Sequence, residues 1–156
     1  MRKSRRFAQL DVFADRPGAG NPLAVVLDAE GVDSESMQAF AAWTNLSETT
    51  FLFPPIRPEA SYRVRIFTPR QELPFAGHPS VGSAHAALES GLCKAVDGHL
   101  VQECGAGLLP MRVEGEGAER RISCAHRSAA RSNSARTSRP GRACSTACNL
   151  AGCQRC

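Results

Sequence analysis

Glu48 is the first of two side chains whose type and setting suit proton-transfer chemistry. It lies near the apolar residues Leu46 and Phe51, and three hydroxyl side chains surround it. A carboxyl group partly withdrawn from water has a raised pKa, which suits it to act as acid and base near neutral pH. These residues alone favour the simpler interpretation, a solvated loop glutamate.

His78 is the second candidate, at the expected start of a helix over residues 79–89. Pro79 is typical of a first helical position, and a helix N-terminus keeps a nearby histidine neutral by disfavouring further positive charge. We expect free N–H groups in the first turn to offer an anion site for a substrate carboxylate, from Ser80, Val81, Gly82 and Ser83. A plain capping role is the simpler alternative for His78.

The other candidates carry weaker signals. His85 falls on the inward stripe of the same helix and is interpreted as a core histidine, while His99 begins a strand. Four cysteines could supply zinc ligands, but only the last pair has a familiar spacing; they are Cys144, Cys148, Cys153 and Cys156. The eight arginines of residues 120–156 have no aromatic residue among them for base stacking, so we expect no nucleic-acid partner.

The composition of the chain changes sharply near residue 120. Residues 1–119 carry 11 Lys and Arg against 15 Asp and Glu, a net charge of −4, whereas residues 120–156 carry eight Arg and no acid. Residues 124–156 contain one large aliphatic residue, Leu150, and no Phe, Trp or Tyr. Such a segment buries too little apolar surface to offset the conformational entropy lost on folding. We predict a folded domain over residues 1–122 and a disordered or out-of-frame tail over residues 123–156.

The sequence shows no secretory signal and no apolar run near the ~20 residues that span a bilayer. We therefore expect a cytoplasmic protein with reduced thiols and no membrane partner.

Periodicity and turn residues predict an α+β domain. Strands are expected over residues 7–14, 23–27, 51–53, 62–68, 99–103 and 108–113. A helix over residues 34–43 has Asp33 as its N-cap, with Met37, Phe40 and Trp43 expected in the core or just beneath the surface. The helix over residues 79–89 is small and apolar on nearly every side, which is typical of an enclosed helix, and Gly91 suits its C-terminal left-handed position.

Three motifs, in order and at matching spacing, resemble the PhzF-like phenazine biosynthesis family. They are Gly20-Asn21-Pro22 with LAVV, Asn45-Leu46-Ser47-Glu48-Thr49 with TF, and RIFTPRQELPFAGHPSVGSAH. The string ELPFAGHP followed by GSAH is their most specific part. The resemblance covers about residues 7 to 122.

This resemblance implies the diaminopimelate epimerase-like fold, here one half of it: a curved mixed or antiparallel sheet wrapped around a central helix. It also implies a cofactor-independent isomerase of a biosynthetic pathway, needing neither metal nor organic cofactor, that moves a proton on a small unsaturated cyclic acid. Glu48 would be its catalytic acid and base. The implied substrate-binding residues are Gly77, His78, Ser80, Gly82 and Ser83.

The family's second domain, with its EDPATGS-like motif, has no counterpart in the sequence. We therefore expect a truncated, one-walled cleft with weak or no activity, because positioning and water exclusion supply much of such catalysis. The uncovered cleft face should be apolar and promote association, so a homodimer is among the expected states. The alternative is a non-catalytic fragment that binds a small carboxylate or a partner.

Overall fold

The computed structural model of the protein describes residues 4–117, 120–124 and 148–149. In these ranges the chain forms two helices and nine strands. The helices are α1 (Ser34–Thr44) and α2 (Gly77–Glu89). The strands are β1 (Phe7–Val12), β2 (Asn21–Val26), β3 (Glu48–Phe53), β4 (Tyr62–Phe67), β5 (Glu72–Leu73), β6 (His99–Cys104), β7 (Gly107–Glu114), β8 (Arg121–Cys124) and β9 (Cys148–Asn149).

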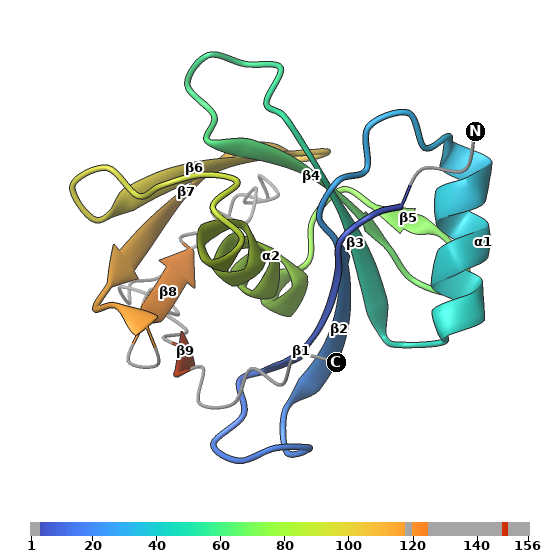
Figure 1. Ribbon diagram of the computed structural model, residues 1–156, viewed down its shortest axis with the longest axis horizontal. Coiled ribbons are helices and arrows are strands. Elements are labelled where there is room, and N and C mark those ends of the chain that lie inside the picture. The colour runs from blue at the N-terminus through green and yellow to red at the C-terminus, as the bar shows by residue number, and fades with distance from the viewer. Residues whose placement is uncertain (1–3, 118–119, 125–147, 150–156) are drawn as a thin grey trace, which may run out of the picture.

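All nine strands belong to one mixed sheet in the order β1-β2-β3-β4-β6-β7-β8-β9, with β5 paired to β4. The β2–β3 and β4–β6 pairs are parallel, and the others are antiparallel. The sheet curls so that strands from both of its ends lie around α2 (Figure 1). This is the predicted α+β architecture, a curved sheet around a central helix.

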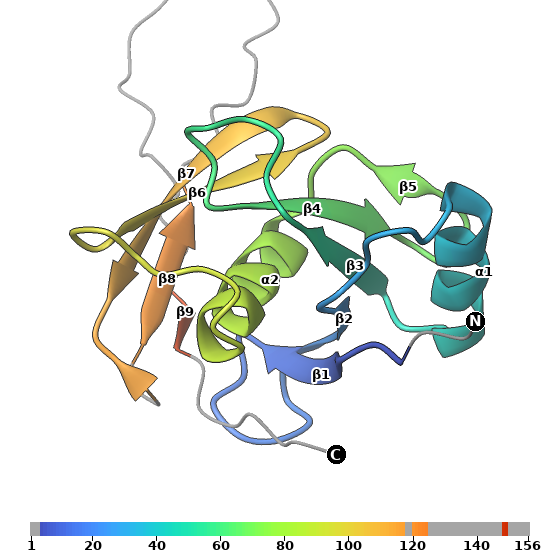
Figure 2. The ribbon, with the colours of Figure 1, turned by 45° about the horizontal axis from the view of Figure 1, so that its top comes forward.

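The sheet has a different helix on each face. On the concave face, every residue of α2 from 79 to 87 is buried, and its core includes Leu23, Leu52 and Met111. On the outer face, α1 covers a smaller cluster that includes Phe51 and Phe67 (Figure 2). β3 contributes to both clusters because successive side chains of a strand point to opposite faces.

Local signals in the sequence predicted several of these elements. Asp33 caps α1 by accepting a hydrogen bond from the Ser36 N–H at 2.7 Å. Gly91 follows α2 with φ of 73°, the left-handed conformation that favours glycine. The β4 residues Tyr62 and Val64 face inward, as the alternation predicted.

Other expectations need correction. The predicted turn over residues 69–74 contains the short strand β5. A strand that the sequence did not predict, β8, extends the sheet to Cys124. Within the predicted tail, Cys148–Asn149 also pairs with β8; the rest of the tail lies outside the described residues. Trp43 does not pack beneath the surface, since 79% of it is exposed. No helix of the described part is long and apolar enough to cross a membrane.

Candidate active site

Glu48 is the first residue of β3, not part of a loop. The strand begins three residues before its predicted start because Glu48 pairs with Leu23 of β2, a parallel contact that local sequence does not encode. Strand alternation places Glu48, Thr50 and Leu52 on the face toward α2. Thr50 confirms this orientation, since its hydroxyl oxygen accepts a hydrogen bond from the Ser83 hydroxyl at 2.9 Å.

α2 begins at Gly77, two residues before its predicted start, so His78 lies inside the first turn. Its N-cap is Ala76, which has no capping side chain, so the sequence carried no start signal there. Pro79 is the third helical residue. A proline is tolerated there because first-turn N–H groups make no intrahelical hydrogen bond.

These two elements bring Glu48 and His78 together. Glu48 Oε2 lies 3.1 Å from His78 Nε2, and the side chains are only 16% and 14% exposed. The contact lacks hydrogen-bond geometry, and both atoms are buried without a hydrogen-bond partner in the described chain. A buried carboxylate oxygen without a donor is costly, and such atoms are typical of sites that bind or react with a ligand.

His78 is held as a predominantly neutral imidazole. Burial lowers its pKa below the ordinary value, while the nearby Glu48 carboxylate and a hydrogen bond to the Pro22 carbonyl oppose the shift. The Pro22 carbonyl also accepts a hydrogen bond from the Ser47 hydroxyl at 3.1 Å. The start of β2 therefore anchors the residue that precedes Glu48.

The other predicted binding residues occupy different positions along α2. The Ser80 N–H donates to the Ala76 carbonyl at 3.2 Å and is not free as expected. Ser80, Gly82 and Ser83 are buried, and a Cβ at Gly82 would come within 2.5 Å of Leu23 Cδ2. Within the described residues, the first-turn N–H groups left for an anion are those of Gly77 and His78. A Cβ at Gly77 would have no atom within 4 Å.

A chain of buried hydrogen bonds, which sequence reasoning missed, fixes the start of α2. The Tyr62 hydroxyl donates to Gln102 Oε1 at 2.8 Å, and Gln102 Nε2 donates to the Ser80 hydroxyl oxygen at 2.9 Å. The Ser80 hydroxyl in turn donates to the Ala76 carbonyl at 2.8 Å. Because Tyr62, Gln102 and Ser80 are fully buried, this chain holds the helix end that carries His78 against β4 and β6.

The remaining chemical candidates lie apart from this pair. His85 is buried as expected, and its Nδ1 has no hydrogen-bond partner in the described chain. Residues 4–117, 120–124 and 148–149 contain no group of three His, Cys, Asp or Glu side chains that could hold a metal ion. The hypothetical zinc site needs Cys144, Cys153 and Cys156, which fall outside the described residues.

The chain is similar to curated proteins over its folded part. It is 50% identical over 110 residues to "Antisense-enhancing sequence 1" of Schizosaccharomyces pombe, covering 70% of this chain and 37% of that protein. It is 48% identical over 81 residues to trans-2,3-dihydro-3-hydroxyanthranilate isomerase of Pseudomonas aeruginosa, covering 52% of this chain and 29% of that enzyme. The chain thus spans about a third of the length of the curated relatives it matches.

Solved structures place the fold. A PhzF-family phenazine biosynthesis protein of Bacillus anthracis superposes with a TM-score of 0.68 at 34% identity, covering 78% of this chain and 40% of that one. A probable proline racemase of Agrobacterium radiobacter shares the fold alone, with a TM-score of 0.59 at 15% identity. The fold is therefore the diaminopimelate epimerase-like one. The model of the PhzC-PhzF family, described as phenazine biosynthesis-like protein, matches residues 10–151, and the chain belongs to this family.

Proposed function

We propose that Glu48 and His78 form the proton-transfer wall of an isomerase site that acts on a small unsaturated cyclic acid. The observation that carries the proposal is Glu48 Oε2, a buried carboxylate oxygen that lacks a hydrogen bond within the described chain and lies 3.1 Å from His78 Nε2. The relative named trans-2,3-dihydro-3-hydroxyanthranilate isomerase supports this class of reaction and substrate.

The proposed chemistry needs one carboxylate and no added group. Glu48 removes a proton from a carbon next to the unsaturated system, the electron pair moves along the conjugated bonds, and Glu48 returns the proton to the far end. Atoms and charge balance, because the substrate loses one proton to Glu48 and regains one from it. The proton held on the Glu48 carboxyl group exchanges with solvent in an open site, so part of the returned hydrogen comes from water. The neutral His78 ring orients the substrate, and the Gly77 and His78 N–H groups at the positive end of α2 bind its carboxylate.

The site as proposed has one wall. The matched relatives are about three times as long as the matched segment, and catalysis of this kind depends on positioning and water exclusion. We therefore expect slow turnover by this chain alone. The second candidate is binding of a small carboxylate without turnover, which the open space beside Gly77 and the free first-turn N–H groups favour.

The test is solvent-proton exchange by the full chain in deuterated water. Trans-2,3-dihydro-3-hydroxyanthranilate is the probe, and proton NMR follows deuterium entering its carbon positions. We expect measurable exchange in the wild-type chain and a loss of about 10²- to 10⁴-fold in Glu48→Gln, the range for removing a general acid or base.

Glu59→Gln is the matched control, because Glu59 is an exposed loop carboxylate. It should exchange at the wild-type rate. Equal exchange by Glu48→Gln and wild type would contradict the assigned role of Glu48. Calorimetric binding of the probe with no exchange in the wild-type chain would support the binding-only function instead.

Three further expectations stay part of the proposal. The chain acts in the cytoplasm without a nucleic-acid or membrane partner, and the free thiols of Cys93, Cys104 and Cys124 support a reducing compartment. The division into a folded unit over residues 1–122 and a tail over residues 123–156 also stays a proposal, in which β8 and the paired segment Cys148–Asn149 carry the sheet across the boundary. A homodimer is among the expected assemblies, which sedimentation of the purified chain would test.

A further inference from the structure

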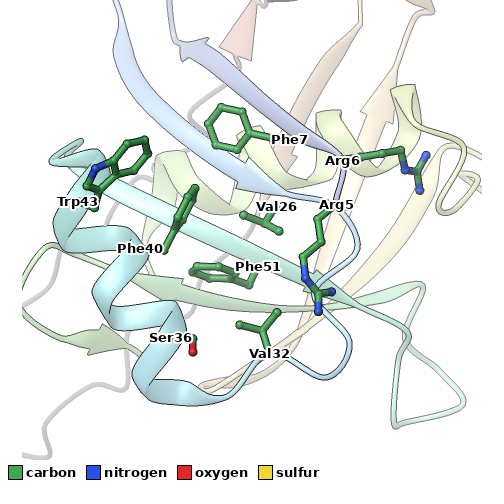
Figure 3. A pocket seen from close by; sticks show the side chains of 9 residues that line it. All are labelled: Arg5, Arg6, Phe7, Val26, Val32, Ser36, Phe40, Trp43 and Phe51. Atoms are coloured by element: carbon green, nitrogen blue, oxygen red, sulfur yellow. The ribbon is translucent and has the colours of Figure 1, made fainter. Parts of the chain in front are cut away.

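A cavity of about 550 Å³ lies on the outer face of the sheet, between α1 and the β1–β2 edge. Its floor is Val26 and Phe51, and α1 forms one side (Figure 3). Its volume falls within the range of roughly 300 to 1,000 Å³ that is typical of small-molecule sites. Glu48 points to the opposite face of β3, so this cavity is separate from the proposed active site.

Aromatic rings gather at one end of the cavity (Figure 3). Phe40 packs against Trp43 with ring centroids 5.7 Å apart and an interplanar angle of 33°. Phe7 meets Phe40 edge-on at 6.1 Å. Phe7 and Trp43 are 48% and 79% exposed, so ring surface remains uncovered. Such surface favours a flat ring, which gains both apolar burial and ring–ring contact.

Arg5 supplies a positive charge at the other end (Figure 3). Its Nη1 donates to the carbonyl oxygens of Asp28 and Glu30, which orient the guanidinium without a carboxylate. Its Nε and Nη2 donate to no atom of the described chain and are available to a ligand. Arg6 differs, because its guanidinium points away and pairs with both Asp28 carboxylate oxygens at 2.8 and 2.9 Å.

We propose that this cavity binds a small aromatic carboxylate, with the ring against Phe7, Phe40 and Trp43 and the carboxylate on Arg5. The separation of apolar and cationic ends selects a molecule that is flat and apolar at one end and anionic at the other. Guanidinium–carboxylate hydrogen bonds are charge-assisted and directional, so the anionic end determines the orientation.

The probe is 2-naphthoate, a flat aromatic carboxylate, and 2-naphthamide is its uncharged counterpart. Trp43 is the only tryptophan in the chain, so its indole N–H gives a single NMR signal at the proposed site. We expect saturable binding of 2-naphthoate by calorimetry and a matching shift of the indole signal. The affinity for 2-naphthamide should be at least about tenfold lower than that for 2-naphthoate.

Single substitutions test whether 2-naphthoate binds in this cavity. Arg5→Gln should weaken binding of 2-naphthoate about tenfold while leaving binding of 2-naphthamide unchanged. Arg70→Gln, at an exposed arginine outside the cavity, should bind both as wild type does. Ser36→Phe, which fills the cavity from α1, should abolish binding, and Glu48→Gln should leave it intact.

Three outcomes would overturn the proposal. One is the absence of saturable binding, and another is equal affinity for the acid and the amide. The third is sedimentation showing that the chain self-associates and that Ser36→Phe dissociates it, since a second copy would then occupy the cavity. Glu48→Gln should lose proton exchange but keep binding of 2-naphthoate. The cavity proposal and the isomerase proposal can therefore fail independently of each other.

Discussion

The two faces of β3 show how one strand can serve two kinds of site. On the face toward α2, Glu48 ends in a buried carboxylate oxygen without a hydrogen bond in the described chain, beside the His78 ring. On the face toward α1, Phe51 forms the floor of an apolar cavity. The first face carries polar atoms without hydrogen bonds at the edge of the core around α2. The second face carries apolar surface that α1 covers only in part.

The difference follows from what covers each face. α2 is wrapped by strands from both ends of the sheet, so its side chains are small, and its Ser80 and Ser83 hydroxyls are hydrogen-bonded to side chains of the sheet. In the part of the chain that the structure describes, the first turn of α2 leaves the N–H groups of Gly77 and His78 open to a ligand. α1 contacts the sheet along one side alone, so bulky side chains at its edge, such as Trp43, remain exposed.

The largest stability effect should come from the α1 face. Phe51 is 2% exposed and packs edge-on against Phe67, with ring centroids 5.5 Å apart. Phe51→Ala should lower the free energy of unfolding by about 3 to 5 kcal/mol, because it leaves a cavity in the outer core. Trp43→Ala should change it by less than about 0.5 kcal/mol. Urea denaturation measures both, and similar losses would contradict the exposed placement of Trp43.

A smaller effect should come from the tight packing of α2 on the sheet. A Cβ at Gly82 would lie 2.5 Å from Leu23 Cδ2 and 2.8 Å from Val12 Cγ2, so Gly82→Ala overpacks the core. We expect a loss of about 1 to 2 kcal/mol, since overpacking outweighs the gain in helix propensity. Gly77→Ala has open space and should be neutral or stabilising by up to about 1 kcal/mol. If Gly82→Ala stabilised the protein in urea, the close contact would be refuted.

The smallest effect should be the pH dependence of stability. Burial lowers the pKa of His78 and of His85, so each binds a proton more readily in the unfolded chain. Their contribution to the free energy of unfolding is complete above the unfolded-state pKa of about 6.5. It is lost as the pH falls from there through the lowered pKa values of the folded chain. His78→Gln should flatten this decline in urea midpoints. An unchanged slope in His78→Gln would show that His78 is not buried.

Sequence reasoning succeeded where local signals act and failed where contacts between distant segments decide. Asp33 as N-cap and the alternation of β4 are local, and the structure agrees with both. The start of β3 at Glu48 depends on pairing with Leu23, and the start of α2 at Gly77 has no capping side chain. The outer cavity was missed because its lining comes from four separate segments of the chain.

The imidazole pKa of His78, followed by NMR in wild type and in Glu48→Gln, tests most directly whether Glu48 and His78 act as one pair. Burial places the wild-type pKa below about 6.5, and the Glu48 carboxylate partly offsets that shift. Removing this charge should therefore lower the pKa of His78 further. A pKa of His78 that stays constant or rises in Glu48→Gln would contradict the pair.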